Sequence, residues 1–308
     1  MSDWTVNDIP PQSGRLAVVT GATGGLGYET ALALAQAGAE VVLLGRNETK
    51  GREALQRISA IVPQAKLRFE NVDLANLVSV RDCAARLLAQ NRPIDMLINN
   101  AGVMAPPQRK TTVDGFEIQF ATNHLSHFLL TAQLLPLLRR SPHPRIVNVS
   151  SSAARMGSIH FDDLQSERSY KAFPVYSQSK LANLLFTFEL QRHSDANGWN
   201  LMSNAAHPGY ALTDLIANGP GADSLMSRLG GLIIKPILSQ SAAAGALPTL
   251  FAASSPNATP AGYYGPDGLF ELKGNVHPAH IPSKAKDVSV ARRLWEISNQ
   301  LTGAPWPK

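Results

Sequence analysis

Six short apolar runs, each the length of a β-strand, recur along the chain and are mostly separated by longer helix-like stretches. They cover residues 16–20, 40–44, 67–72, 96–99, 145–149 and 201–206. Runs such as Ala17-Val18-Val19 are apolar at consecutive positions, which a strand requires when helices cover both faces of a parallel sheet. The alternation predicts an α/β protein with a doubly wound parallel sheet and with ligands at the carboxyl ends of its strands.

The length of the chain fits one broad domain or two smaller ones. A chain of 308 residues with 44% hydrophobic residues can bury a large core. Because no boundary stands out, we expect a single domain over residues 1–308, with the cofactor and catalytic motifs in a core over 13–206. Residues 207–238 are expected to form a cofactor turn and a small substrate lid, and residues 239–302 a helix, a strand and a helix.

The apolar pattern loosens over residues 213–238. Gly219-Pro220-Gly221 breaks regular structure, and the positions that follow form an apolar face. The pattern predicts a mobile substrate lid, and the open alternative is a surface helix whose apolar stripe packs permanently on the body. A membrane-surface helix is disfavoured because Arg228 and Lys235 supply little of a basic face.

Composition narrows the classes of protein and partner. The one cysteine, Cys83, excludes an internal disulfide framework and a cysteine zinc site, and the histidines lack paired metal-ligand spacing, so no metal is expected. The polar residues 1–12 and the lack of an apolar span of about 18 residues predict a cytoplasmic protein with no integral membrane segment. The net charge of +5 is spread without a basic run, which disfavours nucleic-acid binding.

A glycine-rich turn lies between the first apolar run and a helical pattern over residues 28–36. It reads Thr20-Gly21-Ala22-Thr23-Gly24-Gly25-Leu26-Gly27. Between a strand and a helix, such a turn lets backbone N–H groups approach a pyrophosphate, and the helix N-terminus adds a partial positive charge. The turn lacks the Gly-Lys-Ser/Thr ending of a P-loop, which disfavours a nucleoside triphosphatase. It therefore predicts a Rossmann-type dinucleotide site with contacts from Gly21, Thr23, Gly25, Leu26 and Gly27.

The end of the second apolar run predicts which dinucleotide binds. Folds that prefer NAD place an acid there to hold the ribose 2′-hydroxyl, whereas here Gly45 is followed by Arg46 and Asn47. A guanidinium can hold a 2′-phosphate through charge-assisted hydrogen bonds. We therefore expect NADP(H) to be preferred and NAD(H) to be possible. The alternative role of Arg46 is that of a solvated loop arginine.

Tyr176 and Lys180 lie one helical turn apart in a segment whose helical pattern continues through Leu190. A phenol with an ordinary pKa of about 10 is a poor base near neutral pH, and an ammonium group beside it stabilises the phenolate. We therefore predict that Lys180 lowers the pKa of Tyr176 and that the pair transfers protons. The same spacing alone also arises where a surface tyrosine stacks on a lysine stem.

The order of these motifs resembles the classical short-chain dehydrogenase/reductase (SDR) superfamily over nearly the whole chain. The glycine turn, Asp73-Leu74, Asn99-Asn100-Ala101-Gly102 and the Tyr176/Lys180 pair follow one another as in that family. Residues 148–164 and 291–296 are most similar to the branch of retinol dehydrogenases, WW-domain oxidoreductases and protochlorophyllide reductase-like proteins. The resemblance implies cofactor contacts from Asp73, Leu74, Asn100, Ala101 and Gly102.

The resemblance also implies the remaining catalytic and cofactor residues. Ser151 is favoured among Ser150, Ser151 and Ser152, because the family's serine is the second of the pair that closes the fifth strand. Asn123 would order a carbonyl and a water for proton relay, and Ser151 would hold the substrate oxygen. Lys180 would also bind the nicotinamide ribose. The turn after the sixth strand would contact the cofactor through Pro208, Gly209 and Thr213.

The implied reaction is an NAD(P)-dependent interconversion of a carbonyl and its alcohol. Hydride passes between the cofactor and a hydrophobic aldehyde or ketone, and Tyr176 gives or takes the proton. Two alternatives stay open, a carbon–carbon double-bond reductase and a non-catalytic NADP sensor. The expected partners are a small-molecule substrate and further copies of the chain, because many family members form homodimers or homotetramers through the helices bearing Asn123 and Tyr176.

Overall fold

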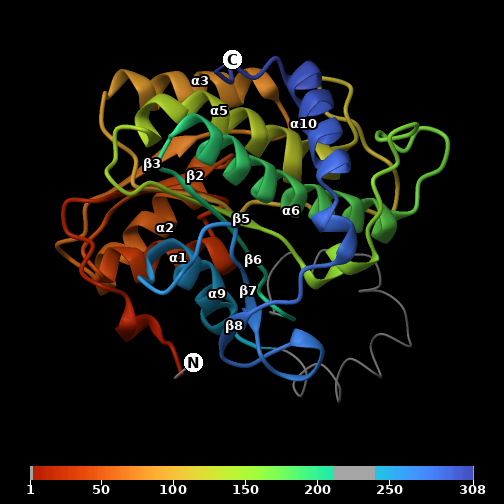
Figure 1. Ribbon diagram of the computed structural model, residues 1–308. Helices are drawn as coiled ribbons and strands as arrows, with labels where there is room; N and C mark the ends of the chain where they lie inside the picture. Colours follow the sequence, from red (N-terminus) through yellow and green to blue (C-terminus); the bar gives the residue numbers. More distant parts are fainter. Residues whose placement is uncertain (1–2, 211–239, 308) are drawn as a thin grey trace.

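The computed structural model describes residues 3–210 and 240–307. Thr213 and the predicted lid over 213–238 therefore lie outside the described residues. Within the described ranges, one central sheet lies between two layers of helices (Figure 1). This arrangement confirms the predicted Rossmann-type doubly wound fold.

The central sheet contains eight strands in the order β3-β2-β1-β4-β5-β6-β7-β8. Neighbours pair in parallel, except that β7 and β8 are antiparallel. The strands are β1 (Leu16–Thr20), β2 (Glu40–Gly45), β3 (Leu67–Asn71), β4 (Met96–Asn99), β5 (Arg145–Val149), β6 (Met202–Ala206), β7 (Tyr263–Pro266) and β8 (Val276–Pro278). Each of the predicted strands is confirmed to within about one residue at its ends, and β8 is an addition to the predicted helix, strand and helix. The strand order reverses between β1 and β4, which opens a crevice at their carboxyl ends.

Two helical layers cover the sheet, and alternate residues of a central strand face opposite layers. Ala17 and Val19 share a core with α1 (Gly25–Gln36), α2 (Glu48–Ile61) and α9 (Ala242–Ser254). Leu16 and Val18 share a second core with α3 (Leu77–Ala89), α5 (Ser126–Leu138) and α6 (Ala172–Asn197). Because both faces of β1 are buried, every position of its run is apolar or small.

The C-terminal helix α10 (Val288–Thr302) packs beside α6, outside the second layer (Figure 1). The rings of Trp295 on α10 and of Trp306 beyond it lie 5.0 and 5.3 Å from the Phe128 ring on α5. Both also contact the Phe186 ring on α6, at 5.9 and 6.3 Å. An assembly through the helices bearing Asn123 and Tyr176 would meet α10 at this face, and the oligomeric state stays a prediction.

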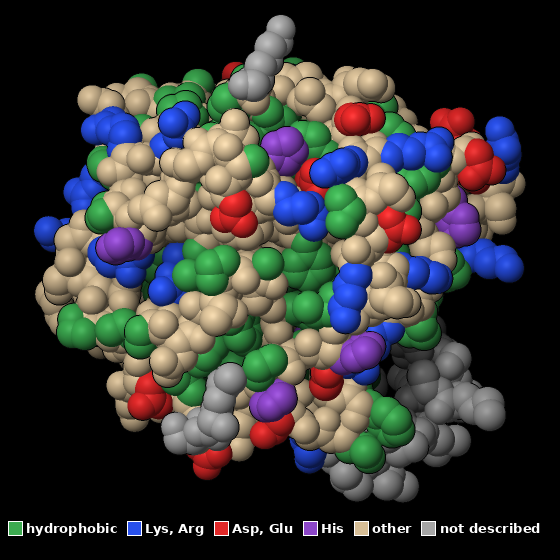
Figure 2. Space-filling model, viewed as in Figure 1, with side chains coloured by type: hydrophobic (Ala, Val, Ile, Leu, Met, Phe, Trp, Pro, Cys, Tyr) green, Lys and Arg blue, Asp and Glu red, His purple; other side chains and the backbone are tan. Residues whose placement is uncertain are grey.

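The described residues offer few other chemical features outside the crevice. None of their helices is long and apolar enough to cross a membrane, and residues 3–210 and 240–307 contain no group of three metal-binding side chains. Cys83 is buried on α3, where burial raises the pKa of its thiol to about 12, so it packs as a small apolar side chain. On the face drawn in Figure 2, Lys and Arg side chains are scattered among other types.

Candidate active site

The glycine turn connects β1 to α1 with little side-chain bulk. Gly21 has a φ of +65°, and α1 begins at Gly25 rather than at the predicted Tyr28. The sequence pattern missed this start because glycine is a weak helix former. A Cβ at Gly27 would lie 2.4 Å from the Gly21 carbonyl oxygen and 2.5 Å from Asn100 Nδ2. Only glycine allows this approach, which leaves the first amides of α1 open to an anion.

Thr20 holds the residues after β4 beside this turn. Its Oγ1 accepts hydrogen bonds from the N–H groups of Asn100, at 2.9 Å, and Ala101, at 3.0 Å. Asn100 Nδ2 donates in turn to the Thr20 carbonyl at 2.8 Å. Because β1 and β4 flank the reversal in strand order, the two predicted cofactor segments, 20–27 and 100–102, meet in one crevice.

Two adjoining hollows of about 420 and 460 Å³ occupy this crevice and share Gly21, Thr23, Arg46, Ala101 and Gly102. Further predicted residues that line the first are Gly25, Leu26, Gly27, Asn47, Asn100, Tyr176, Lys180 and Pro208. The second is also lined by Asp73 and Leu74. Gly209 lines neither hollow. The joined hollows and their glycine cradle, which a Cβ would fill, fit a dinucleotide in close contact with the backbone.

Basic side chains border the first hollow beyond β2. Arg46 and Lys50 both line it, and Asn71 Nδ2 donates to the Arg46 carbonyl at 3.1 Å. Asn47 is the N-cap of α2, where its Oδ1 accepts from the Lys50 N–H at 3.0 Å. Sequence reasoning missed Lys50, and the available signal was its place in the first turn of the helix after Arg46. Two cations therefore border the region where this fold holds a ribose 2′-substituent.

Tyr176 and Lys180 lie one turn apart on α6, and both are buried. Lys180 Nζ is 5.7 Å from the centre of the Tyr176 ring and donates to the Val149 carbonyl at 3.0 Å. Burial raises the pKa of Tyr176 to about 12, although a hydrogen bond with Ser151 acts to lower that pKa. Burial lowers the pKa of Lys180 to about 8. The predicted lowering of the Tyr176 pKa is therefore wrong for the chain on its own, because desolvation of the phenolate dominates.

Asn123 lies in η2 (Ala121–Leu125), a π-helical turn just before α5. Its Nδ2 donates to Ser179 Oγ at 2.8 Å and to the Val103 carbonyl at 3.0 Å, and its Oδ1 accepts from the Val103 N–H at 2.7 Å. One buried amide thus joins α6 to the loop after β4. Single π-turns inside helices are frequent at functional sites, and the sequence pattern did not predict this one.

The three candidate serines have different surroundings. Ser150 is buried, and its Oγ donates to the Lys180 carbonyl at 2.8 Å. Ser151 is the N-cap of η3 (Ser152–Met156), and its Oγ accepts from the Ala153 N–H at 3.2 Å. Its side chain also acts to lower the pKa of Tyr176. Ser152 is the first residue of η3. Ser151 is the candidate that acts on the phenol of Tyr176, and its catalytic role stays a prediction.

The turn after β6 closes another side of the crevice. His207 is buried, and the N–H of Gly209 donates to His207 Nδ1 at 3.3 Å. Gln240 Nε2 donates to the Pro208 carbonyl at 2.6 Å, and Pro208 lines the first hollow. Gly209 has a φ of +61°, and a Cβ there would lie 2.3 Å from the Leu272 carbonyl oxygen. The turn is therefore fixed by a backbone approach that only glycine permits.

Sequence reasoning considered His127 only as a metal ligand. Its buried ring lies 3.0 Å from the Asn123 carbonyl through Nδ1 and 2.9 Å from Thr20 Oγ1 through Nε2. Because the Asn123 carbonyl only accepts, Nδ1 carries the ring proton, and Nε2 of the neutral ring accepts from the Thr20 hydroxyl. Burial lowers the pKa of His127 to about 4, so the ring is neutral. It joins Asn123 to the glycine turn, and its spacing of four residues from Asn123 was the available signal.

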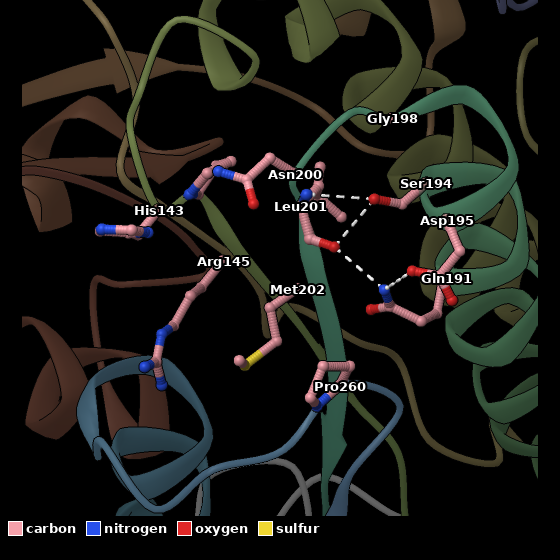
Figure 3. Close-up of a pocket in the computed structure, with 11 residues that line it drawn as sticks. His143, Arg145, Gln191, Ser194, Asp195, Gly198, Asn200, Leu201, Met202 and Pro260 are labelled. Atoms are coloured by element: carbon pink, nitrogen blue, oxygen red, sulfur yellow. Dashed lines mark hydrogen bonds between the residues drawn. The ribbon is translucent and has the colours of Figure 1, made fainter.

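A third hollow, of about 450 Å³, lies at the opposite edge of the sheet, where β5 and β6 begin (Figure 3). Gln191 and Ser194 both donate to the Leu201 carbonyl, at 3.1 and 2.9 Å, and Gln191 also donates to Asp195 at 2.8 Å. These bonds tie the end of α6 to the start of β6. Among the described residues, none of the predicted catalytic or cofactor residues lines this hollow, so we assign it to the scaffold.

This chain is similar in sequence to known dehydrogenases and in structure to a solved protein. The family model described as short chain dehydrogenase matches residues 15–220. Retinol dehydrogenase 11 from Homo sapiens is 38% identical over 95% of this chain and 87% of its own length, and polyprenol dehydrogenase from Homo sapiens is 37% identical over 96% and 87%. The crystal structure of an uncharacterized protein from Mycobacterium paratuberculosis is 39% identical, with a TM-score of 0.82 and coverage of 100% of both chains. The chain therefore belongs to the short-chain dehydrogenase family, in its retinol dehydrogenase-like branch, and is an oxidoreductase that acts on CH–OH groups.

Proposed function

We propose that the protein is an NADP(H)-dependent oxidoreductase that interconverts a hydrophobic aldehyde or ketone and its alcohol. The observation that carries this proposal is that Tyr176 and Lys180 line the dinucleotide crevice together. Ser151 acts on the Tyr176 phenol, and Asn123 bonds to Ser179 on the same helix. A phenol that hydrogen-bonds a serine hydroxyl beside a buried ammonium suits proton transfer to an oxygen atom. The reaction class follows from this placement.

Each side chain has a separate task in the proposed reaction. When bound, the nicotinamide supplies or accepts the hydride. Tyr176 donates its proton to the carbonyl oxygen, and its raised pKa keeps the phenol protonated for that step. Ser151 hydrogen-bonds the same oxygen and holds it near the phenol. Lys180 binds the nicotinamide ribose, and in alcohol oxidation its ammonium favours the phenolate.

The basic end of the crevice supports a preference for NADP(H). Arg46 and Lys50 line the first hollow, and no Asp or Glu is among the described residues that line it. Two cations would attract a 2′-phosphate, whereas a carboxylate would repel it. We expect the KM for NADPH to be at least about tenfold lower than that for NADH, because a charge-assisted hydrogen bond contributes about 1.5–3 kcal/mol. A KM for NADH lower than that for NADPH would overturn the proposed preference for NADP(H).

Exposed apolar side chains on α6 and η3 support a hydrophobic substrate. The ring of Phe173 lies 6.2 Å from that of Tyr176 and is 46% exposed. Met156, at the end of η3, is 65% exposed. The names of two relatives specify retinol and polyprenol, which are alcohols with apolar chains. We therefore propose that substrates of this class are preferred over short polar carbonyls.

A screen of NADPH oxidation against aldehydes, ketones, quinones and retinoids tests the proposal, with Tyr176→Phe as the control variant. We expect turnover by the wild type and an alcohol as the product. Cofactor binding without turnover would favour the sensor alternative. A product reduced at a carbon–carbon double bond would favour the double-bond reductase.

We also propose that the protein works in the cytoplasm, the location expected from the scattered distribution of its charged residues. Fractionation of cells that express the tagged full chain tests this location. The tagged protein is expected in the supernatant after ultracentrifugation. Recovery in the membrane pellet contradicts the proposal.

A further inference from the structure

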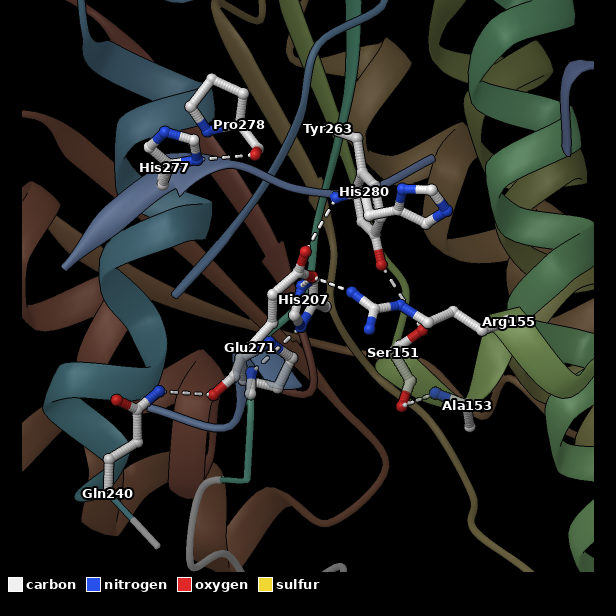
Figure 4. A network of polar contacts seen from close by, with 12 residues as sticks. Ser151, Ala153, Arg155, His207, Gln240, Tyr263, Glu271, His277, Pro278 and His280 are labelled. Atoms are coloured by element: carbon white, nitrogen blue, oxygen red, sulfur yellow. Dashed lines mark hydrogen bonds and ion pairs between the residues drawn. The ribbon is translucent and has the colours of Figure 1, made fainter. Parts of the chain in front are cut away.

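One carboxylate joins three segments at the rim of the crevice (Figure 4). Glu271 lies in η4 (Leu269–Glu271), between β7 and β8. Its Oε2 accepts from His207 Nε2 at 2.8 Å and forms an ion pair with Arg155 on η3. Its Oε1 accepts from the His280 N–H at 2.9 Å. Both oxygens are therefore bound by donors from segments that are far apart in the sequence.

These bonds leave one protonation state for His207, whose side chain is fully buried. A carboxylate only accepts, so the ring proton is on Nε2, and the Gly209 N–H only donates, so Nδ1 is the acceptor. Burial by itself would raise the pKa of Glu271, but hydrogen bonds from His207 and His280 bring it down to about 2. The network therefore contains an ionised Glu271 and a His207 ring that donates through Nε2 and accepts through Nδ1.

Arg155 and His207, which both bond to Glu271, each lie next to a segment of the proposed reaction site. Arg155 belongs to η3, whose N-cap is Ser151. His207 comes directly before the Pro208-Gly209 turn, and Pro208 lines the first hollow. Glu271 thus connects the segment that bears the proposed substrate-binding hydroxyl to the turn that borders the cofactor.

The ring of Tyr263 strengthens the same connection. Its hydroxyl donates to the Ser151 carbonyl at 3.4 Å, and its ring lies 5.2 Å from that of His207. The side chain is buried, with 4% of its surface exposed. Tyr263 therefore fills the space between the two segments that Glu271 joins.

The backbone at Phe270 and Glu271 adopts a left-handed conformation that is unfavourable for residues with side chains. Phe270 and Glu271 have φ values of +53° and +57°, a region that residues with side chains seldom adopt. The Tyr210 N–H donates to the Leu272 carbonyl at 2.7 Å, and Gly209 packs against the same carbonyl. Strained backbone persists where surrounding contacts over-determine it, and such sites cluster around functional residues.

We propose that Glu271 is a positioning residue that sets the distance between Ser151 and the Pro208-Gly209 turn. The inference rests on the proposed function, in which Ser151 holds the substrate oxygen and the turn holds the nicotinamide end of the cofactor. Because Glu271 acts through Arg155 and His207, its loss misplaces the two reactants and removes no proton donor. A misplacement of about 1 Å can cost about 100-fold in rate.

Glu271→Gln tests the proposal, because it keeps the side-chain shape and points amide N–H groups at donors. With NADPH and an aldehyde that the wild type reduces, we expect kcat to fall about 10- to 100-fold. The Kd for NADPH is expected to stay within about threefold of the wild-type value, because the glycine turn is unchanged. Arg155→Met should cause a similar loss, and the double variant should lose no more than either single variant, because coupled side chains act as a unit.

Glu70→Gln is the matched control. The Glu70 side chain is 17% exposed and pairs with Arg86 at 2.9 Å, and the Glu271 side chain is 19% exposed and pairs with Arg155. Glu70 lies on β3, at the other end of the sheet from β8, so its loss should leave kcat unchanged. A Glu271→Gln enzyme with kcat within about twofold of the wild type, or losses that add in the double variant, overturns the positioning role.

Imidazole ¹⁵N NMR of the cofactor-free protein supplies a readout without turnover. We expect the Nε2–H tautomer of His207 in the wild type and loss of that preference in Glu271→Ala. An Nδ1–H ring in the wild type overturns the network. Wild-type protein that turns over no carbonyl overturns the proposed function and this inference together. Turnover that Tyr176→Phe abolishes and Glu271→Gln leaves intact overturns the positioning role alone.

Discussion

On the cofactor side of the crevice, Gly27 lies against the backbone of Gly21, and both belong to one short turn. On the substrate side, Glu271 bonds to His207 from 64 residues away and pairs with Arg155 on another element. The first side depends on glycines without side chains and on local backbone geometry, whereas the second depends on partly exposed charges that the fold brings together. Changes on the first side should therefore act on cofactor affinity, and changes on the second should act on turnover.

Tyr176→Phe gives the largest expected effect and tests the catalytic side. The change removes the transferable proton and little volume, so we expect kcat to fall about 1,000-fold. The Kd for NADPH should stay within about twofold. Steady-state kinetics and cofactor fluorescence measure the two quantities, and an unchanged kcat would falsify the assignment of Tyr176.

Lys180→Met is expected to lower kcat by less than Tyr176→Phe does and to stabilise the fold at pH 7. Burial lowers the pKa of Lys180 from 10.5 to about 8, and the gap corresponds to at most about 3 kcal/mol. Below pH 8 the Lys180 amine is protonated in both the folded and the unfolded chain, so the folded protein bears the full cost of burying the ammonium. Between pH 8 and 10.5 the unfolded chain binds more protons, so wild-type stability rises with pH. Denaturant unfolding at pH 7 and pH 10 measures the free energy of unfolding of both proteins. The stabilisation of the variant relative to the wild type should be smaller at pH 10 than at pH 7. A variant less stable than the wild type at pH 7 contradicts this account.

Gly27→Ala tests the cofactor side. Its Cβ would lie 2.4 Å from the Gly21 carbonyl oxygen, so the turn must open, at a cost of about 1–3 kcal/mol. We expect the Kd for NADPH to rise about 10- to 100-fold, while kcat at saturating cofactor changes little. In the control, Gly198→Ala, the glycine has a φ of +61° and nothing within 4 Å of the added Cβ. That variant should lose about 1 kcal/mol of stability and keep its cofactor affinity; equal affinity losses in both would show that general destabilisation is the cause.

Asn47→Asp has the smallest expected effect and sharpens the cofactor side. Asp and Asn are comparable N-caps, so α2 keeps its cap and Tm stays unchanged. The new charge beside Arg46 should raise the Kd for NADPH severalfold, by about 1 kcal/mol, and should leave the Kd for NADH as it was. Equal weakening of both cofactors would show that Asn47 does not lie near a 2′-phosphate.

Much of the fold and of the cofactor side could be predicted from the sequence. The apolar runs marked β1 to β6, because strands covered on both faces need apolar residues at nearly every position. The π-turn at Asn123 and the antiparallel β8 leave no such pattern, so they were missed. The pKa of Tyr176 was judged from its spacing to Lys180 alone, whereas burial of the phenol raises that pKa.

Local features were therefore determined by the sequence itself: the strand positions, the glycine turn, the basic end of β2, and the one-turn spacing of Tyr176 and Lys180. Each depends on residues that are neighbours in the chain, whose geometry elementary stereochemistry sets. The tertiary structure alone decided that Ser150 bonds to the Lys180 carbonyl, that His127 and Asn123 join the glycine turn to α6, and that Glu271 bridges η3 and the turn after β6. These contacts depend on burial and on long-range packing, because charge and desolvation act through space rather than along the sequence.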